Sequence, residues 1–543
     1  MKSIGLLFLS LASFFGSYSQ TWQDTLSLIE KTMIQYKPEN PGCQLSISRN
    51  GEIIFSKAWG MADLEHHSPL TTQSVSEAGS VSKQFTAAAI LLLQQQGKVS
   101  IDANVRQYVP ELPDYGSRPI LVRHLLHHTS GLREWSDIAE LTGWSRGQKF
   151  YTNKDILEMV TRQKGLNFIP GAEYLYSNSN FFLLTLIVER VSGMSLPAFT
   201  DQYIFKPAGM IHTQWRDDPK RIVSNRAMAY AKSGNDYFTN MPNENVYGPG
   251  GLLTTTEDLL KWNDFYQSGK LGNPSIFPMQ IATEPLNNGV MNRYAAGLVI
   301  NKIMGWDNIS HDGATASYRA ILENFPELHL SIAMLSNTSQ FNLGSTENAI
   351  RKIFVADKLV KKQDDEPGIH LPASFLQTIE GLYVNERNRA TFQLTARNDT
   401  LVYNNSQPLK PVSKNIIKTY NFQFDISGGK GYYINYYSKD TIRVTKVSPA
   451  TLAPKDFAAY EGTYFSEETN STLSIQHDST QLTLRLNANK VFTLTPTYKD
   501  AFKVEDLGYE IQFTRNEQGK PSSIRFYSGR TRGVEFGKQS LRK

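Results

Sequence analysis

The chain has very little cysteine and few long apolar segments, and both shortages limit what it can be. Its 543 residues include one cysteine, Cys43, so no disulfide can form within the chain. A protein of this length without disulfides depends on large hydrophobic cores, and two or three domains are expected. We expect Cys43 to be a small core residue of the first strand rather than a catalytic group.

Charge of one sign is not concentrated anywhere along the chain. The formal net charge of +5 is spread without a basic run, which argues against a nucleic-acid partner. Hydrophobic residues make up 40% and charged residues 20%, which is typical of folded globular domains and excludes wholesale disorder.

Residues 1–19 have the layout of a secretory signal peptide. Lys2 gives a positive start, residues 4–15 are almost wholly apolar, and the small residues Ser17 and Ser19 precede the expected cleavage point. This run is shorter than the ~20 apolar residues that span a bilayer, and no other run in the sequence is long enough, so no transmembrane segment is expected. The pattern predicts an exported protein, periplasmic or secreted; a buried N-terminal helix is the alternative.

Residues 20–362 mix strand and helix patterns. Strand-like runs at 44–48 and 53–59 flank an Asn-Gly turn, which predicts a hairpin. Further strands are expected at 295–303, 318–324 and 328–335, and helices at 84–96, 181–191, 254–266 and 345–361. Early strands, a helical middle and late strands predict an α/β (α+β) domain. Its antiparallel sheet would join the first and last strands and carry helices on both faces.

Residues 363–372 are predicted to be a linker, because they begin with a charged, turn-rich run free of apolar residues. Beyond it short alternating strands prevail, and Glu-Gly-Leu-Tyr at 380–383 recurs as Glu-Gly-Thr-Tyr at 461–464. Two small antiparallel β-barrels, at 373–453 and 454–543, are the simplest explanation. Closed eight-stranded barrels leave no exposed edges and require no disulfide. Chance similarity of a four-residue motif is the alternative.

Ser80 and Lys83 are the first candidates for chemistry. Three residues apart on a helix, their side chains share one face, with about 5–6 Å between the β-carbons. A serine hydroxyl becomes a useful nucleophile when a neighbouring amine assists by taking its proton. The same spacing occurs at 427–430 and 540–543, but only Ser80 precedes a predicted buried helix. At a helix N-terminus the backbone N–H of Ser80 is also free to donate to an oxyanion.

Tyr176 and Asn178 stand just before the second apolar helix. A phenol ordinarily has a pKa near 10, but the ammonium of Lys83 would favour the phenolate. Tyr176 would then be a base towards Ser80 and an acid towards the leaving group. Asn178 is suited to orient Lys83 and a substrate amide. Tyrosine-x-asparagine recurs elsewhere in the chain, so this spacing alone carries little weight.

His311 and Gly313 form the one His-x-Gly of the sequence, at the end of a predicted strand. Gly313 would let a substrate backbone approach closely, and the N–H of Ala314 would be a second oxyanion donor. His311 is suited to bind or polarise a substrate group, although a lone histidine is usually structural. Three other histidines lack a matching carboxylate or cysteine set, so neither a metal nor a cofactor is expected: His124, His127 and His128.

Together these motifs resemble, in order and spacing, the penicillin-recognising serine hydrolases of the class C β-lactamase, esterase and D-aminopeptidase group. Residues 125–132 look like that family's loop after the nucleophile helix, and 250–252 resemble its later glycine turn; the resemblance covers 42–337. It implies a β-lactamase-like catalytic domain with Ser80 as the acylated nucleophile. By the same resemblance Lys83 and Tyr176 transfer protons, Asn178 orients the substrate, and the amides of Ser80 and Ala314 bind the oxyanion.

One motif departs from the β-lactamase pattern. Class C enzymes carry Lys-Thr-Gly where this chain has His-Asp-Gly at 311–313, and a neutral histidine is a poorer anchor for a substrate carboxylate. His-x-Gly resembles instead the D-aminopeptidase branch, which also carries two C-terminal lipocalin-like barrels.

The sequence therefore predicts a serine hydrolase acting on a small-molecule or peptide substrate, with peptides, amides or esters as substrates and a D-amino-acid preference as one option. A β-lactamase or cell-wall DD-carboxypeptidase is the enzymatic alternative, and a non-catalytic ligand-binding protein the other. Homo-oligomerisation is left open.

Overall fold

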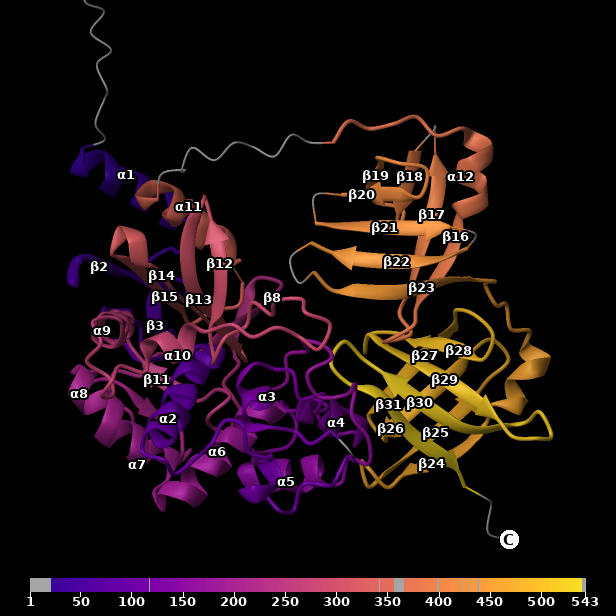
Figure 1. The fold of residues 1–543 in the computed structure, drawn as a ribbon, viewed down its shortest axis with the longest axis horizontal. Coiled ribbons are helices and arrows are strands. Elements are labelled where there is room, and N and C mark those ends of the chain that lie inside the picture. The colour runs from indigo at the N-terminus through magenta and orange to yellow at the C-terminus, as the bar shows by residue number, and fades with distance from the viewer. Residues whose placement is uncertain are drawn as a thin grey trace, which may run out of the picture.

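A computed structural model describes residues 21–116, 118–340, 342–355, 366–397, 400–419, 421–427, 429–436 and 439–539. The predicted signal peptide lies outside the described residues, as do the start of the predicted linker and the end of the predicted helix 345–361. Figure 1 shows a sheet-and-helix domain on the left and two β-barrels, one above the other, on the right.

A six-stranded antiparallel sheet forms the centre of the first domain. Its strands lie in the order β12 (Val299–Ile303), β13 (Trp306–Thr315), β14 (Tyr318–Phe325), β15 (Leu330–Ser336), β1 (Cys43–Arg49) and β2 (Glu52–Trp59). β1 pairs with β15 in one register, with Cys43 opposite Ser336 and Arg49 opposite Leu330. The early and late strands thus meet, and the predicted fold class is confirmed.

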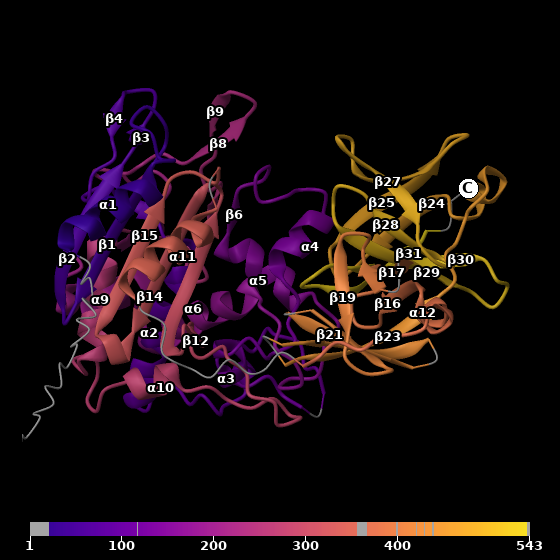
Figure 2. The same ribbon diagram turned by 90° about the horizontal axis from the view of Figure 1, so that it is seen from above.

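Helices cover both faces of this sheet, as Figure 2 shows from above. One face, with Leu45 and Ile332, packs against α1 (Trp22–Met33) and α11 (Leu343–Phe354). The other face, with Leu322 and Leu335, joins a large core that includes α2 (Lys83–Gln95), α6 (Asn178–Ser192) and α9 (Thr256–Gln267). Cys43 is fully buried in β1, as expected for a small core residue.

Short helices and small sheets occur between β2 and β12 in the sequence. The short helices are α3 (Val122–Leu126), α4 (Trp135–Leu141), α5 (Asn153–Thr161), α7 (Leu196–Thr200), α8 (Lys206–Ala208) and α10 (Phe277–Ile281). Small sheets pair β3 (Met61–Asp63) with β4 (Ser68–Pro69), β6 (Tyr151–Thr152) with β10 (Glu244–Asn245), β8 (Tyr230–Ser233) with β9 (Asp236–Thr239), and β11 (Leu252–Thr254) with β5 (Ser76–Glu77) and β7 (Gln214–Trp215).

Three elements differ in their bounds from the prediction. α6 begins at Asn178, earlier than the predicted 181–191, because the carboxylate of Glu134 accepts the Asn178 N–H and takes the place of a local cap. α9 is capped by Thr255, which accepts the N–H of Asp258, one residue later than the predicted capping box. His311 lies inside the ten-residue strand β13 rather than at its end.

Two closed antiparallel barrels follow the linker. The first barrel comprises β16 (Gly381–Asn385), β17 (Thr391–Arg397), β18 (Thr400–Tyr403), β19 (Gln407–Pro411), β20 (Ile416–Lys418), β21 (Phe422–Ser427), β22 (Lys430–Asn435) and β23 (Thr441–Val447), and α12 (Ala373–Ile379) precedes it. The second barrel comprises β24 (Gly462–Ser466), β25 (Ser471–His477), β26 (Leu482–Asn487), β27 (Lys490–Pro496), β28 (Ala501–Val504), β29 (Tyr509–Arg515), β30 (Pro521–Tyr527) and β31 (Arg532–Lys538).

The two barrels start alike. Gly381 and Gly462 both have φ of +148°, and an added Cβ would lie 2.5 Å or 2.6 Å from a lysine side chain of the closing strand. Two residues later, the hydroxyls of Tyr383 and Tyr464 each donate a 2.8 Å hydrogen bond to the carbonyl four residues earlier. The repeated motif therefore marks the same position in two barrels and is not a chance similarity.

The second barrel packs directly on the first domain beside α4 and α5 (Figures 1 and 2). One continuous hydrophobic core contains residues of both, among them Trp135 and Tyr464. Arg133 reaches across to Glu468 in a buried ion pair of 2.6 Å. The first barrel has a separate core of its own.

Within the described part of the chain, no single helix is both long and apolar enough to cross a bilayer. The bent pair Asn178–Ser192 and Leu196–Ala208 would be long and apolar enough only if its two helices were counted together.

Candidate active site

Ser80 lies in a 3₁₀ turn, Gly79–Ser82, that leads directly into α2. The turn is fixed by Ser82, whose hydroxyl donates to the Gly79 carbonyl at 2.5 Å and accepts the N–H of Leu252 at 3.1 Å. Lys83, fully buried, is the first residue of α2. The spacing thus brings Lys83 Nζ to 3.1 Å from Ser80 Oγ.

Two other atoms contact Lys83 Nζ, and both are acceptors. Asn178 Oδ1 lies at 2.8 Å and the carbonyl oxygen of Pro249 at 2.6 Å. A neutral amine has two N–H groups and one lone pair. When the two N–H groups are donated to these acceptors, the lone pair is left for the hydroxyl proton of Ser80.

The surroundings of Lys83 favour that neutral form. Burial lowers the pKa of Lys83 well below its ordinary value, and the carboxylate of Glu134 opposes this shift in part. The guanidinium of Arg530, which comes from the second barrel, lowers the pKa of Lys83 further. Lys83 is therefore equipped to accept the proton of Ser80.

Tyr176 lies beside Lys83, but not as a phenolate. Lys83 Nζ stands 4.7 Å from the centroid of the phenol ring. Burial raises the pKa of Tyr176 well above its ordinary value; the hydroxyl of Ser80 opposes the rise and the carboxylate of Asp312 adds to it. The prediction that Lys83 would favour the phenolate is therefore wrong, because burial removes the hydration of the phenolate and a neutral Lys83 offers no cation to stabilise it. A neutral phenol is a proton donor.

Asn178 connects Lys83 to a carboxylate that the sequence analysis missed. Its Oδ1 accepts from Lys83, and its Nδ2 donates to Glu134 Oε1 at 3.1 Å. Glu134 immediately precedes α4 and is fully buried. It stands 44 residues before Asn178, and no local pattern indicates that the two meet.

The amides of Ser80 and Ala314 lie where two backbone segments approach very closely. Gly79 has φ of +50°, and an added Cβ there would lie 2.7 Å from the Ala314 nitrogen. At Gly313 an added Cβ would lie 2.1 Å from the carbonyl oxygen of Ala78 and 3.1 Å from the Ser80 nitrogen. Only glycine permits this contact, which brings the two predicted oxyanion donors together.

His311 is engaged by protein groups at both ring nitrogens. Nδ1 lies 2.5 Å from the carbonyl oxygen of Asp312, so it carries the proton, and Nε2 accepts the hydroxyl of Tyr294 at 2.9 Å. Burial lowers the pKa of His311 to about 4, so the ring is neutral at physiological pH. In this arrangement the imidazole has no N–H left for a substrate, and its ring centroid lies 6.2 Å from that of Tyr176.

His128, predicted only as part of a loop, forms a wall of the site. Its Nδ1 accepts the N–H of Ser177 at 3.2 Å and the amide of Asn180 at 2.9 Å, so the proton resides on Nε2. Its ring centroid lies 4.3 Å from that of Tyr176. Burial lowers the pKa of His128 well below its ordinary value, so a neutral imidazole holds the Tyr176 ring in place.

Two hollows meet at Ala314, and Ser80 lines the smaller one. A small cavity of about 40 Å³ is lined by Ser80, Asn178 and Ala314, together with Trp135, Arg146, Glu244 and Val246. A larger hollow of about 750 Å³ shares Ala314 and extends over β12, β13 and β14 to the start of α11. The space directly beside Ser80 is therefore small, and the larger hollow lies towards α11.

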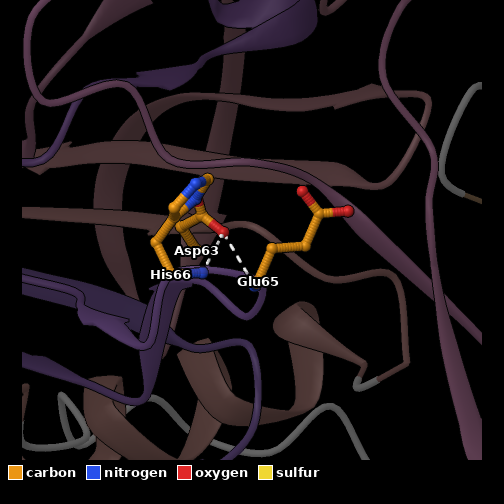
Figure 3. Close-up of side chains that lie close together, drawn as sticks. All are labelled: Asp63, Glu65 and His66. Atoms are coloured by element: carbon orange, nitrogen blue, oxygen red, sulfur yellow. Dashed lines mark hydrogen bonds and ion pairs between the residues drawn. The ribbon is translucent and has the colours of Figure 1, made fainter.

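A cluster of possible metal ligands occurs outside this site. Asp63, Glu65 and His66 lie together at a turn after β3, as Figure 3 shows. Asp63 Oδ1 accepts the N–H groups of Glu65 and His66, and Asp63 Oδ2 contacts His66 Nδ1 at 2.7 Å. These bonds account for the turn, and we assign it no ligand.

The comparisons with known proteins fit this geometry. A family model described as Beta-lactamase matches residues 29–356. The chain belongs to the β-lactamase family. A second model, for a domain of unknown function (DUF3471), matches residues 446–541 and so covers the second barrel.

Two relatives and one solved structure illustrate the similarity to other β-lactamase-family proteins. Penicillin-binding protein 4* of Bacillus subtilis (strain 168) is 30% identical over 313 residues, which are 54% of this chain and 67% of that protein. A D-aminopeptidase of Cereibacter sphaeroides (strain ATCC 17029 / ATH 2.4.9) is 29% identical over 300 residues, 55% of this chain and 57% of its own length. The octameric penicillin-binding protein homologue from Pyrococcus abyssi has a TM-score of 0.54 at 22% identity and covers 78% of this chain and 99% of that one, which supports the shared fold.

Proposed function

We propose that this β-lactamase-family protein is an exported serine hydrolase that cleaves small peptides, amides or esters through an acyl-enzyme on Ser80. The observation that carries the proposal is the position of Lys83 Nζ, 3.1 Å from Ser80 Oγ, with its other two neighbours both hydrogen-bond acceptors. Export is supported by the signal-peptide pattern of residues 1–19.

Acylation begins when the neutral amine of Lys83 takes the proton of Ser80 and Oγ attacks the substrate carbonyl carbon. The amides of Ser80 and Ala314 stabilise the oxyanion. Tyr176, a neutral phenol, gives a proton to the leaving amine or alkoxide as the carbon–leaving group bond breaks, and the ammonium of Lys83 restores that proton to Tyr176. Lys83 then accepts a proton from water as the water oxygen attacks the acyl carbon, and it returns that proton to Ser80 Oγ as the bond between Oγ and the acyl carbon breaks.

The acyl group is small and, we propose, derived from a D-amino acid. The cavity of about 40 Å³ beside Ser80 favours a short side chain. The D-aminopeptidase among the relatives supports the stereochemical preference. A β-lactamase or DD-carboxypeptidase is the second candidate, favoured by the relative named as a penicillin-binding protein. Neutral His311 counts against it, because it offers no cation to a substrate carboxylate.

The test is hydrolysis of D-alanine 4-nitroanilide, its L-form, a short acyl nitrophenyl ester and a chromogenic cephalosporin by the mature protein. We expect turnover of the D-anilide and the ester, falling at least about 10³-fold in Ser80→Ala. Rapid turnover of the cephalosporin alone would favour the second candidate. Activity that survives Ser80→Ala would exclude Ser80 as the nucleophile, and ligand binding without any turnover would favour a non-catalytic role.

The pH profile tests the role of Lys83. Because burial lowers the pKa of Lys83, the neutral base should persist to lower pH than an exposed lysine would allow, and kcat/KM for the nitrophenyl ester should reach its plateau well below the ordinary pKa of a lysine. The raised pKa of Tyr176 predicts no fall on the alkaline side up to pH 10. Lys83→Arg should abolish turnover, because arginine stays protonated. A profile that rises only above pH 9 would contradict a neutral Lys83.

A further inference from the structure

The loop between β30 and β31 of the second barrel docks on the residues that begin α4. Ser528 Oγ donates to Asp137 Oδ2 at 2.5 Å, and the N–H of Glu134 donates to Thr531 Oγ1 at 3.2 Å. On the other side, the amide of Asn167 donates to the Arg530 carbonyl at 2.9 Å. Arg530 is therefore held beside Glu134 by contacts on both sides of its own position.

Glu134 fixes the orientation of Asn178. Its Oε2 accepts the backbone N–H of Asn178 at 2.5 Å, and its Oε1 accepts the side-chain amide at 3.1 Å. Because a carboxylate accepts and cannot donate, the Nδ2 of Asn178 must face Glu134 and the Oδ1 must face Lys83. Protonation of Glu134, or its movement, would remove this constraint.

A fully buried carboxylate is stable only when its charge is compensated. Arg530 Nη1 lies 3.9 Å from Glu134 Oε2, and its side chain also approaches Asp137 at 3.8 Å. Among the charged groups of the described chain, Arg530 acts most strongly to lower the pKa of Glu134. The strongest compensating cation thus comes from the second barrel, while Arg146 of the catalytic domain also interacts with Glu134.

We propose that Arg530 is a positioning residue of the active site, which acts through Glu134 and Asn178 to keep the amine of Lys83 aligned on Ser80. The second barrel is then a part of the catalytic apparatus. This inference rests on the proposed hydrolase function and names a regulator of the same site.

The electrostatic surroundings of Lys83 allow a sharp test. The charged and titratable groups that act on or pack against it come from several elements: Glu134, Arg146, Tyr176, His128, His311, Asp312 and Arg530. Of these, Glu134 raises the pKa of Lys83 and Arg530 lowers it. Removal of the two charges should therefore shift the acid limb of the pH profile in opposite directions.

The experiment measures kcat and KM for a neutral nitrophenyl ester across pH in Arg530→Gln, Arg530→Lys, Glu134→Gln and the double variant. We expect Arg530→Gln to lower kcat by up to about 10²-fold with little change in KM, and to move the acid limb to higher pH. Glu134→Gln should move the acid limb to lower pH, and the acid limb of the double variant should lie between those of the two single variants. Arg530→Lys should keep most of the wild-type kcat.

Arg532→Gln is the matched control. Arg532 also pairs across the same interface, to Glu173 Oε2 at 2.9 Å, but has no contact with Glu134 among the bonds described. We expect its kcat and acid limb to match the wild type, with melting temperatures recorded for every variant.

Two results would overturn the inference. In the first, Arg530→Gln has the same kcat, KM and pH profile as Arg532→Gln. In the second, Arg530→Gln changes only KM, and does so only for substrates that carry a carboxylate. The second result would make Arg530, whose side chain is 37% exposed, a substrate-binding group. If the wild type hydrolyses nothing, the proposed function fails, and a crystal structure of Arg530→Gln decides the inference separately. Loss of the Lys83–Asn178 hydrogen bond would support it, and an unchanged bond would refute it.

Discussion

The two barrels share a topology and a starting motif, yet they relate to the rest of the chain differently. The first barrel keeps a closed core of its own, and its contact with the catalytic domain includes the pair Arg387–Glu173 at 3.2 Å. The second barrel shares one hydrophobic core with the catalytic domain and places Arg530 beside Glu134. A small cluster that includes Val384 and Tyr498 joins the barrels to each other.

This difference teaches that a repeated fold does not imply a repeated role. The features common to both barrels, such as the hydroxyls of Tyr383 and Tyr464, tie the first strand of each barrel to the residues that precede it. The features that differ lie in loops: the β30–β31 loop carries the groups that reach the site. If Arg530 acts as we propose, the role of the second barrel at the active site depends on its loop and not on the repeated strands.

The largest expected effect comes from the buried ion pair of the second barrel. Glu468→Ala would leave the Arg133 guanidinium buried without its carboxylate, at a cost of about 3–5 kcal/mol in the free energy of unfolding. Arg387→Gln, the control at the first barrel, removes a more exposed contact and should cost less. Calorimetric unfolding of the two variants measures both losses of stability. Equal losses would contradict the view that the second barrel is attached more tightly to the catalytic domain than the first.

A cavity in either barrel core should have a smaller but still large effect. Leu394 and Ile475 occupy matching places, each paired with the glycine that starts its barrel, and both are buried. Their change to alanine should cost about 2–5 kcal/mol. Because Ile475 belongs to the shared core, Ile475→Ala should lower the temperature at which hydrolysis is lost, whereas Leu394→Ala should leave it unchanged. If Leu394→Ala and Ile475→Ala lowered this temperature equally, the first barrel would also be coupled to the catalytic domain.

The smallest effect should come from the two tyrosine hydroxyls. Tyr383→Phe and Tyr464→Phe each remove one hydrogen bond inside a barrel, which is worth about 1 kcal/mol. Denaturant unfolding should give similar losses for both, since neither bond crosses an interface. A much larger loss in one barrel would mean that the shared motif has diverged in function.

The sequence predicted those features that depend on local spacing. Ser80 and Lys83 share a helix face, and the repeated Glu-Gly-x-Tyr motif predicted two barrels. It did not predict Glu134 or Arg530, because their meeting depends on how a barrel packs on α4. The direction of the Tyr176 shift was also missed, since burial follows from the packing of His128 and Tyr294 around the ring and not from the motif.

The most direct test of the account is covalent labelling of the mature protein with a fluorophosphonate probe, followed by peptide mass spectrometry. The account predicts one adduct on the peptide that contains Ser80, absent from Ser80→Ala and strongly reduced in Lys83→Arg. An adduct on another residue, or equal labelling of Ser80→Ala, would contradict the assignment of Ser80 as the nucleophile.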